Sequence, residues 1–421
     1  MSTPVGVVIN GLTGFAWVHH RAVFAAEQKG LCRLLGYCDH QPSESGERTK
    51  REYRLEERGV PVFPDFASML DSVGERCRLA FIPSPPTIHA ADHAAAISRG
   101  IRCYLEKPPT LSPSEFEAML DLERRVGKSA IVGFNEMADP VRFELKRRLV
   151  RGEFGALERI DVLGFWPRPA AYYGRSRWPG KLMLDGQLVL DSVFGNAMAH
   201  YLHGMLFWGR NDAVWSWASA ASVEAELYRA YEIESADTAF ARGMLNTGVS
   251  FRVAFSHACA ETIDPVETLH CRDATVRLRR GSATVAWSTG RVEDIVADPV
   301  DSHDRCIARV IAEVNGEAVE IPSVGLQQSA SFVKMNALLY VAGATIHQVE
   351  GAVANSGPTT KSIQGVEQAG QRFITDGRLP SEQRMPWGRA GGWATAANID
   401  QLERVIAANC AARLTTNESK T

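Results

Sequence analysis

Five short apolar runs in the first third of the chain constrain the fold more than any other feature of the sequence. Residues 5–9, 34–38, 79–82, 101–105 and 130–134 form these runs, and helical patterns lie between them. Runs of this length are typical of buried strands. Strands that alternate with helices form βαβ units, and repeated units build a mostly parallel, doubly wound sheet. We therefore predict an α/β domain of this kind over residues 1–138.

The turn after the first run has the features of a dinucleotide-binding loop. It lies between a strand and a helical pattern, which is the context in which pyrophosphate binds at a helix N-terminus. Against G-x-G-x-x-G/A, Gly11 fits the first position and Ala16 the third, whereas Thr13 occupies the second and a glycine follows one position later. An ordinary tight turn is the alternative. The candidate cofactor residues of this loop are Gly11, Thr13, Gly14, Phe15 and Ala16.

The second apolar run ends in an acid, Asp39. An acid at the end of the second strand, about 20 residues past a glycine loop, accepts hydrogen bonds from a ribose diol. His40 and Gln41 follow it, so a 2′-phosphate would meet a carboxylate without an adjacent arginine. This favours NAD over NADP, and an ordinary surface acid is the alternative.

Two later runs end in residues that suit a ligand-binding edge. The run at 101–105 stops at Glu106 and Lys107, because two prolines follow and forbid its continuation. In an open α/β sheet, ligands bind at the carboxyl ends of the strands. We therefore predict that Lys107 lies at the ligand-binding edge. Further cofactor candidates at these strand ends are Ser84, Pro85, His89, Glu106 and Asn135.

These motifs together resemble the Gfo/Idh/MocA family, which is named after glucose–fructose oxidoreductase, inositol dehydrogenase and a rhizopine-catabolism protein. Glu106-Lys107-Pro108 and the preceding turn from Ser84 to His89 carry the resemblance, which extends over residues 5 to about 210 and further in outline. It implies an N-terminal NAD-binding Rossmann domain and a C-terminal open, mostly antiparallel sheet. It also implies that this sheet supplies substrate contacts and the face of a homo-oligomer, a dimer or tetramer.

Alternating apolar and polar positions in the second half predict an antiparallel sheet with one covered face. We expect this α+β domain to span residues 139–376, and a loop and helix extension to span 377–421. The strand candidates are residues 157–165, 213–221, 239–245, 249–257, 267–271, 274–278, 283–288 and 307–314, and helical patterns cover 330–347 and 361–375.

One segment of the second half carries candidate catalytic residues. A helical pattern from Asn196 onward places Asn196, His200 and His203 on one face. The resemblance implies an acid and a histidine four apart, with the histidine beside the substrate hydroxyl. His200 matches the histidine, but Asn196 occupies the position of the acid. Asp191 supplies the carboxylate if the preceding loop folds back, and a structural helix histidine is the alternative for His200.

The stretch from Tyr172 to Lys181 combines aromatic rings, bases and glycines. Rings stack on the apolar faces of sugars, and arginine and lysine donate hydrogen bonds to oxygens. A surface loop anchored by Trp178 is the alternative. The complete set of substrate candidates is Lys107, Tyr173, Arg177, Trp178, Asp191, Asn196, His200 and His203.

Charge and composition exclude several classes of partner. The net charge is −3 and the pI about 6.4, so nothing favours nucleic acid or an anionic membrane. No apolar run has the length of a membrane span. The eight cysteines form no Cys-x-x-Cys pair, which favours reduced thiols in the cytoplasm and argues against a zinc site. We expect a cytoplasmic protein with a small-molecule substrate and no metal.

The sequence therefore predicts reversible hydride transfer between NAD and a secondary alcohol of a small sugar, polyol or related hydroxy compound. Here His200 is the general base, Lys107 stabilises alkoxide charge, and Glu106 and Asn135 position Lys107 and the cofactor. Three alternatives stay open. They are an NAD-retaining glycoside hydrolase of the same architecture, a non-catalytic NAD-binding sensor or partner protein, and an imine or enone reductase in which His200 is an acid.

Overall fold

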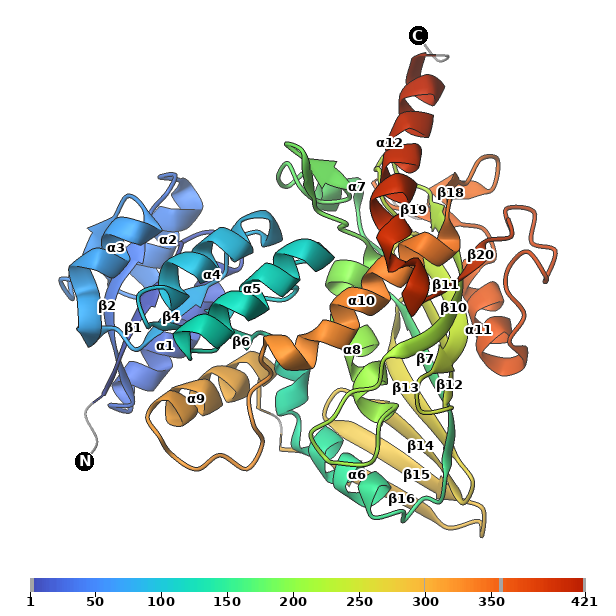
Figure 1. Cartoon of the computed structure of the whole chain (residues 1–421), viewed down its shortest axis with the longest axis horizontal. Helices are drawn as coiled ribbons and strands as arrows, with labels where there is room; N and C mark the ends of the chain where they lie inside the picture. The colour runs from blue at the N-terminus through green and yellow to red at the C-terminus, as the bar shows by residue number, and fades with distance from the viewer. Residues whose placement is uncertain (1–3, 299, 356–358, 419–421) are drawn as a thin grey trace. The chain divides into compact units, whose positions relative to one another are not determined.

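The computed structural model describes residues 4–298, 300–355 and 359–418, which form two compact units (Figure 1). Unit 1 consists of the chain up to Thr110, Ser114–Asp139 and Asp298–Ser329, and unit 2 of Leu111–Pro113, Pro140–Ala297 and the chain from Ala330 onward. The chain therefore leaves unit 1, returns to it and leaves it again. The continuous domains predicted from the sequence, 1–138, 139–376 and 377–421, differ from this division because residues 298–329 belong to unit 1.

Unit 1 contains a parallel sheet of six strands in the order β3-β2-β1-β4-β5-β6. The strand order reverses between β1 and β4, which is the point where doubly wound sheets bind ligands. Every residue of β1 is buried, as expected for a strand that is covered on both faces. The predicted Rossmann fold is confirmed. The strands are β1 (Val5–Ile9), β2 (Cys32–Cys38), β3 (Val62–Phe63), β4 (Leu79–Ile82), β5 (Arg102–Leu105) and β6 (Ile131–Val132).

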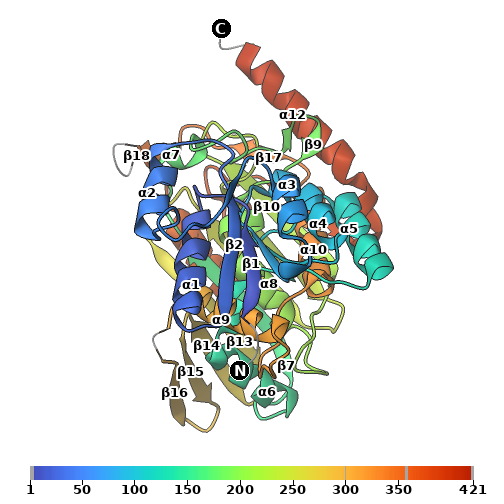
Figure 2. The same cartoon turned by 90° about the vertical axis from the view of Figure 1, so that its left-hand side faces the viewer.

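Two helices from distant parts of the sequence share one apolar cluster of unit 1. Helix α1 packs beside β1 and β2 (Figure 2), and α9 packs against α1. Their apolar residues interlock with those of the strands in one core. The helices of this unit are α1 (Ala16–Gln28), α2 (Glu44–Glu52), α3 (Phe66–Val73), α4 (His89–Ile97), α5 (Pro113–Val126) and α9 (Ser302–Val314).

Helix α9 corrects a wrong prediction, because residues 307–314 were expected to form a strand. The buried residues of α9 recur every three or four positions, which is the period of a helix face. The branched side chains favoured a strand, but the spacing decides the structure. These buried residues are Cys306, Ile307, Val310, Ile311 and Val314.

Unit 2 contains a ten-stranded sheet in the order β16-β15-β14-β13-β7-β12-β11-β10-β17, with β20 paired to β10. Only β7–β12 and β10–β17 are parallel pairs, which confirms the predicted, mostly antiparallel sheet. Its role as an oligomer face stays a prediction. The strands are β7 (Leu157–Phe165), β10 (Ala220–Arg229), β11 (Thr238–Leu245), β12 (Ser250–Ser256), β13 (Ile263–Cys271), β14 (Ala274–Arg279), β15 (Ser282–Trp287), β16 (Val292–Val296), β17 (Ile346–Gln348) and β20 (Gly392–Thr395).

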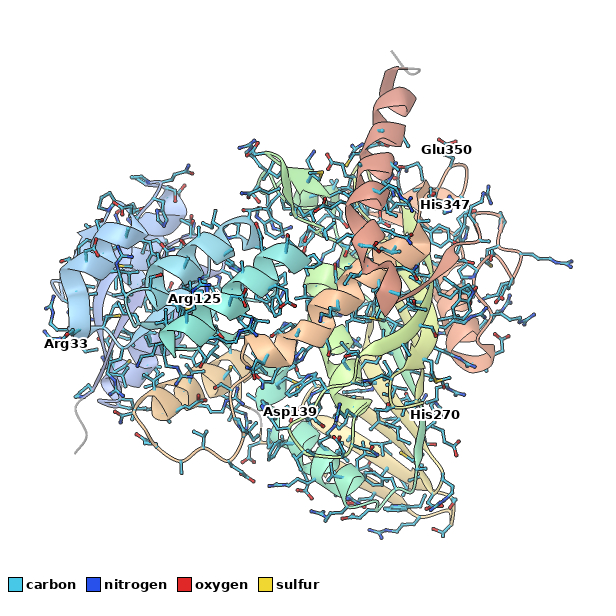
Figure 3. All side chains as sticks on the ribbon, viewed as in Figure 1. Arg33, Arg125, Asp139, His270, His347 and Glu350 are labelled. Carbon is cyan, nitrogen blue, oxygen red and sulfur yellow. The ribbon has the colours of Figure 1, made fainter. Side chains whose placement is uncertain are left out.

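A polar cluster joins two strands at the centre of this sheet. The buried carboxylate of Asp161 on β7 lies 2.6 Å from Nε2 of His270 on β13, which is labelled in Figure 3. Arg159 Nε donates to the same carboxylate over 3.0 Å. A buried carboxylate is stable only when it is paired and hydrogen-bonded, and here both strands contribute a partner.

The predicted extension over residues 377–421 is built into unit 2. Within it, residues 392–395 form β20, and Trp387 is buried with its Nε1 donating to the Gln364 oxygen over 2.9 Å. Two short hairpins pair β8 (Met183–Leu184) with β9 (Gln187–Leu188) and β18 (Val353–Asn355) with β19 (Lys361–Ile363). The helices of the unit are α6 (Pro140–Val150), α7 (Ala170–Tyr173), α8 (Ala199–Trp208), α11 (Val366–Asp376) and α12 (Leu402–Glu418), together with α10 (Leu326–Gly343) from Ala330 onward.

Three other predicted boundaries differ from the structure. Residues 213–218 are a loop, and β10 begins only at Ala220. The predicted helix 330–347 ends at Gly343, and β17 follows it. The predicted helix 361–375 begins as β19 before α11. Among the described helices, none combines the length and the apolar character that a membrane crossing requires.

A buried lysine on α6 joins this helix to the end of α8. The side chain of Lys146 is inaccessible to solvent, lies over the ring of Phe207, and donates to the backbone oxygens of Phe207 and Arg210. Burial lowers the pKa of Lys146 from its usual 10.5 to about 7, because an ammonium group is poorly solvated in the interior.

This burial makes the stability of the protein depend on pH. Between about pH 7 and pH 10 the unfolded chain binds a proton at Lys146 that the folded chain has released, so the free energy of unfolding rises with pH. We expect the wild type to gain up to about 1.4 kcal/mol per pH unit relative to Lys146→Met. Chemical denaturation of both proteins across this window measures the difference. A constant difference would contradict the lowered pKa.

Candidate active site

The glycine loop after β1 has a backbone that requires glycine. Gly11 has a φ of +140° and Gly14 a φ of +61°, values that residues with a side chain rarely adopt. A Cβ added to Gly14 would meet no atom within 4 Å, so a ligand can approach its backbone closely. Helix α1 begins at Ala16 and has no acid in its first turn, which suits an anion at its N-terminus. These residues fit a dinucleotide, and Thr13 and Phe15 lie exposed beside them.

Asp39 lies at the end of β2 as predicted, but its carboxylate has a partner that sequence reasoning missed. Lys50 Nζ lies 2.9 Å from Asp39 and 2.8 Å from Glu47. Hydrogen bonds to Glu47 and Asp39 raise the pKa of Lys50, so it is a cation. Two carboxylates share one ammonium group, and this corner therefore keeps a net negative charge. Lys50 looked like one of many solvated charges in a charge-rich helix, so no signal in the sequence distinguished it.

Polar side chains connect the carboxyl ends of β1 and β4. Asp92 accepts hydrogen bonds from Ser84 Oγ and Asn10 Nδ2, both over 2.9 Å. His40 Nε2 lies 2.7 Å from the side-chain oxygen of Asn10. Burial raises the pKa of Asp92 to about 6, although both hydrogen bonds oppose the shift. Ser84 was predicted at this edge and Pro85 follows it, whereas Asn10 and Asp92 were missed.

His89 is completely buried, so the ring has no exposed surface to offer the predicted cofactor contact. Its Nδ1 lies 2.9 Å from the Pro108 oxygen and its Nε2 lies 2.7 Å from the Ser84 oxygen. Burial lowers the pKa of His89, against the effect of these hydrogen bonds. The imidazole therefore joins the turn after β4 to the turn that carries Lys107.

Lys107 lies two residues after the end of β5 and is half-buried. Its backbone N–H donates to Glu106 Oε2 over 3.3 Å, and Glu106 Oε1 lies 3.0 Å from Nε2 of His19. Burial acts to raise the pKa of Glu106, but the hydrogen bond from His19 and the charges of His19, His303 and Lys107 outweigh it, so the pKa is lowered. A buried carboxylate anion therefore contacts the backbone of Lys107 and interacts electrostatically with its ammonium group.

His19 is the main residue of this site that sequence reasoning missed. It lies on the buried face of α1, three residues after Ala16, and is inaccessible to solvent. A polar residue on the buried face of the helix after a glycine loop was the available signal. Through His19, the first turns of α1 hold the end of β5.

Replacing His19 by alanine is expected to destabilise the fold by about 3–5 kcal/mol, because Glu106 would keep a buried charge without its partner. Denaturant unfolding measures the change. Glu106→Gln in the His19→Ala background is expected to recover part of the loss, since the amide carries no charge. His20→Ala is the control, because His20 is equally buried but contacts the backbone oxygen of Gly11. Simple additivity of His19→Ala and Glu106→Gln would contradict the pairing.

Asn135 is buried and lies three residues after the carboxyl end of β6. Its Nδ2 donates to Ser302 Oγ over 2.6 Å, at the start of α9. Its Oδ1 is buried and has no hydrogen-bond partner among the described residues. The amide therefore fixes α9 on one side, and its predicted contact with the cofactor stays a prediction.

In unit 2, the loop before α8 folds back, which is the condition under which Asp191 was expected to supply the carboxylate. Asp191 is buried and accepts hydrogen bonds from the Gly180 N–H over 2.6 Å and from Asn196 Nδ2 over 2.9 Å. A carboxylate is thus present one side chain away from the position that Asn196 occupies. The side-chain amide of Asn196 donates a hydrogen bond to the carboxylate of Asp191, so the two residues act together at this position.

The predicted helix from Asn196 is interrupted. Residues 193–197 form one π-helical turn, closed by Met198 N–H to the Val193 oxygen over 2.9 Å, and α8 begins at Ala199. Ser192 Oγ accepts the Gly195 N–H over 2.9 Å and caps this turn. The predicted continuous helix from Asn196 is therefore wrong in its first turn, whereas His200 and His203 both lie on α8. Wider turns of this kind are frequent at functional sites.

The two histidines of α8 have different surroundings. His200 is half-buried in the first turn of the helix. His203 is completely buried, with its ring 5.3 Å from Trp217 and 6.5 Å from Phe332. This packing leaves the ring of His203 without solvent-exposed surface, and its predicted substrate contact stays a prediction.

The three substrate candidates of the loop around α7 also differ from one another. Tyr173 packs its ring 5.1 Å from Tyr231, and its buried hydroxyl has no partner among the described residues. Arg177 is largely exposed and pairs with Asp185 over 2.9 Å. Trp178 is half-buried, under the guanidinium group of a neighbouring arginine. Each of the three side chains therefore has a different partner, and their shared role in substrate binding stays a prediction.

The fold and the strand-end residues define an NAD-binding oxidoreductase architecture. Residues 5–134 match the family described as "Oxidoreductase family, NAD-binding Rossmann fold", the Gfo/Idh/MocA family. The resemblance inferred from the motifs around Lys107 is therefore confirmed over these residues, and NAD is the cofactor of this type of domain. A search of curated proteins finds no match.

Solved structures of dehydrogenases share the fold over about four fifths of the chain. The WlbA dehydrogenase from Bordetella pertussis, in complex with NADH and UDP-GlcNAcA, is 19% identical with a TM-score of 0.64, covering 81% of this chain and 96% of that one. UDP-N-acetylglucosamine 3-dehydrogenase from Acidithiobacillus ferrooxidans is 18% identical with a TM-score of 0.62, covering 80% and 97%. A levoglucosan dehydrogenase in complex with NADH and levoglucosan is 15% identical with a TM-score of 0.66, covering 81% and 97%.

Proposed function

We propose that this protein is an NAD-dependent dehydrogenase that interconverts a secondary alcohol and a carbonyl of a small sugar, polyol or related hydroxy compound. The observation that carries the proposal is the Lys107 ammonium group at the end of β5, beside the anionic Glu106 that His19 holds. The similar structures whose names include sugar dehydrogenases support this choice of substrate class.

The chain provides separate groups for the parts of a dinucleotide. The backbone of Gly11 and Gly14 and the N-terminus of α1 bind the pyrophosphate, and Asp39 accepts hydrogen bonds from the adenosine ribose. When bound, NAD supplies the hydride acceptor. Ser84 and Lys107 follow neighbouring strands, β4 and β5, and so line the edge on which the reacting end of a dinucleotide lies.

Two side chains handle the charge and the proton of the substrate hydroxyl. Lys107 donates to the reacting oxygen and stabilises the alkoxide character that develops there. His200 removes the hydroxyl proton, since imidazole titrates near neutral pH. Asn196 donates to the carboxylate of Asp191, which places a negative charge in the turn before α8.

An assay with two readouts tests the proposal. The purified protein is given NAD and a panel of sugars and polyols, and NADH absorbance is recorded. In parallel, chromogenic glycosides are supplied without added NAD. NADH formation with at least one polyol supports the dehydrogenase. Glycoside cleavage without net NADH formation would instead identify an NAD-retaining hydrolase. Tight NADH binding without turnover of any panel member would instead identify a non-catalytic sensor.

The Asp39 corner is expected to select NAD over NADP, because Asp39 and Glu47 leave a net negative charge around Lys50. The double variant Asp39→Asn, Glu47→Gln frees the ammonium group to bind a 2′-phosphate. We expect the ratio of NADPH to NADH affinity to rise about tenfold or more, the usual effect of a hydrogen bond to a charged group. Fluorescence titration with both dinucleotides measures the ratio. Equal affinities in the wild type would contradict the assignment.

A further inference from the structure

In unit 2, two arginines in and next to the predicted substrate loop of residues 172–181 lie over the same aromatic ring, that of Tyr172. Arg168 follows β7, and Arg175 follows α7. Their guanidinium carbons lie 4.9 and 3.8 Å from the ring centroid of Tyr172. The rings of Tyr172 and His257 are in turn 5.9 Å apart. Contacts of this kind attract a cation to the face of a ring and hold it in place.

Neither of these arginines is neutralised by a carboxylate among the residues that the structure describes. The other bases of this stretch differ, since Arg177 pairs with Asp185 over 2.9 Å and Lys181 pairs with Glu234 over 2.6 Å. Arg175 Nη1 donates to the Tyr172 backbone oxygen over 2.5 Å, and not to a carboxylate among the described residues. The stretch therefore contains two paired cations and two guanidinium groups that keep their full charge.

Arg168 also has an unused donor next to open space. Its Nε is buried and has no hydrogen-bond partner among the described residues. A buried donor without an acceptor is costly, and such groups in native structures are usually completed by a ligand or water. An open cleft of about 330 Å³ is lined by Trp166, Pro167, Arg168 and Thr262, so a ligand can reach this side chain.

The two arginines and the carboxylate of Asp191 act electrostatically on the same side chain, that of Tyr172. Burial is the main reason for the raised pKa of Tyr172, and the charge of Asp191 raises it further while both arginines oppose this. Burial likewise lowers the pKa of His257 to about 3, and the charges of Arg168 and Arg175 lower it further. The two guanidinium groups therefore act on both rings, whereas Asp191, which precedes α8, acts on Tyr172.

We propose that Arg168 and Arg175 bind an anionic substituent of the substrate, a carboxylate or a phosphate, so that the substrate is an acidic sugar rather than a neutral one. The planar guanidinium group offers parallel N–H donors that match the oxygens of both anions. Tyr172 positions the two donors before the ligand arrives. The inference rests on the proposed dehydrogenase function, because that function supplies the sugar that carries the anion.

Calorimetric titration of the full chain loaded with NAD tests the inference by binding alone. The probes are glucose, galactose and mannose, their three hexuronates, and their three 6-phosphates. We expect at least one acidic sugar to bind about tenfold or more tightly than its neutral counterpart, as for hydrogen bonds to charged groups. The uronate and phosphate arms then identify the anion. Equal binding of neutral and acidic members in all pairs would overturn the proposal, and this comparison requires no variant.

Variants assign the preference to the two side chains. The double variant Arg168→Gln, Arg175→Gln is expected to lose the preference for the acidic sugar, and single lysine replacements are expected to retain part of it. Arg291→Gln is the matched control, since Arg291 also lies over a ring, 5.6 Å from the centroid of Trp287, but pairs with Glu293. If the folded double variant keeps the preference, the two arginines only stabilise the loop and the proposal is wrong.

The results separate this inference from the proposed function. Turnover of neutral sugars without any preference for acidic ones would remove the inference and leave the dehydrogenase. Arginine-dependent binding of an acidic sugar without NADH formation would leave the anion site and remove the dehydrogenase.

Discussion

Lys107→Ala is expected to lower kcat by about 10²–10³-fold while NADH binding stays close to that of the wild type. This is the usual effect of removing one donor that stabilises developing negative charge. The glycine loop and Asp39 do not depend on the Lys107 side chain, so the dinucleotide keeps its main contacts. Steady-state kinetics on the substrate found by the polyol panel give kcat, and fluorescence titration gives the affinity for NADH.

Two further variants make this result specific to the ammonium group. Lys107→Arg keeps the positive charge but changes its geometry, so its kcat is expected to lie between those of the wild type and the alanine variant. Lys128→Ala removes an exposed lysine of unit 1 and is expected to change nothing. Normal turnover of Lys107→Ala would show that the reacting oxygen is stabilised elsewhere.

His200→Ala is expected to lower kcat by about 10²–10⁴-fold, the range for the loss of a general base. The fall of kcat/KM at acidic pH, which reports protonation of the base, is expected to disappear in the variant. Asp191→Asn keeps the shape of the side chain and removes its charge, so a smaller loss of kcat is expected. A pH–rate profile of each variant on the same substrate checks both statements.

The comparison with other histidines decides whether the effect is chemical or structural. His347→Gln, on β17, is expected to leave kcat unchanged. His203→Gln is expected to lower the melting temperature through its aromatic contacts, with the remaining folded protein still active. If kcat/KM of His200→Ala still falls at acidic pH as in the wild type, the imidazole of His200 is not the base.

Features that depend on local sequence were predictable. The apolar runs led to the sheet and to its carboxyl edge, because a buried parallel strand needs almost only apolar residues. The prolines after Glu106 and Lys107 marked the end of β5 for the same local reason. The position of Lys107 therefore followed from residues next to it in the chain.

Features that depend on distant residues were not predictable. The partner of Glu106 is His19, and the partner of Asp39 is Lys50, a side chain that looks like its solvated neighbours. The interrupted helix before His200 arises from the cap at Ser192, which a residue spacing does not reveal. The strand predicted over residues 307–314 failed because branched residues favour strands in general, while the burial period of this segment is set by α1 and the sheet beneath it.

The return of residues 298–329 to unit 1 affects how the protein is made. During synthesis the nucleotide-binding unit cannot close its core when its six strands have emerged, because the buried residues of α9 are encoded much later. Its apolar surface under α9 stays open while much of unit 2 is being translated. Domains that fold late expose surface on which chaperones act and aggregation begins. A gene fragment that stops at Asp139 would therefore yield an insoluble half rather than a free NAD-binding module.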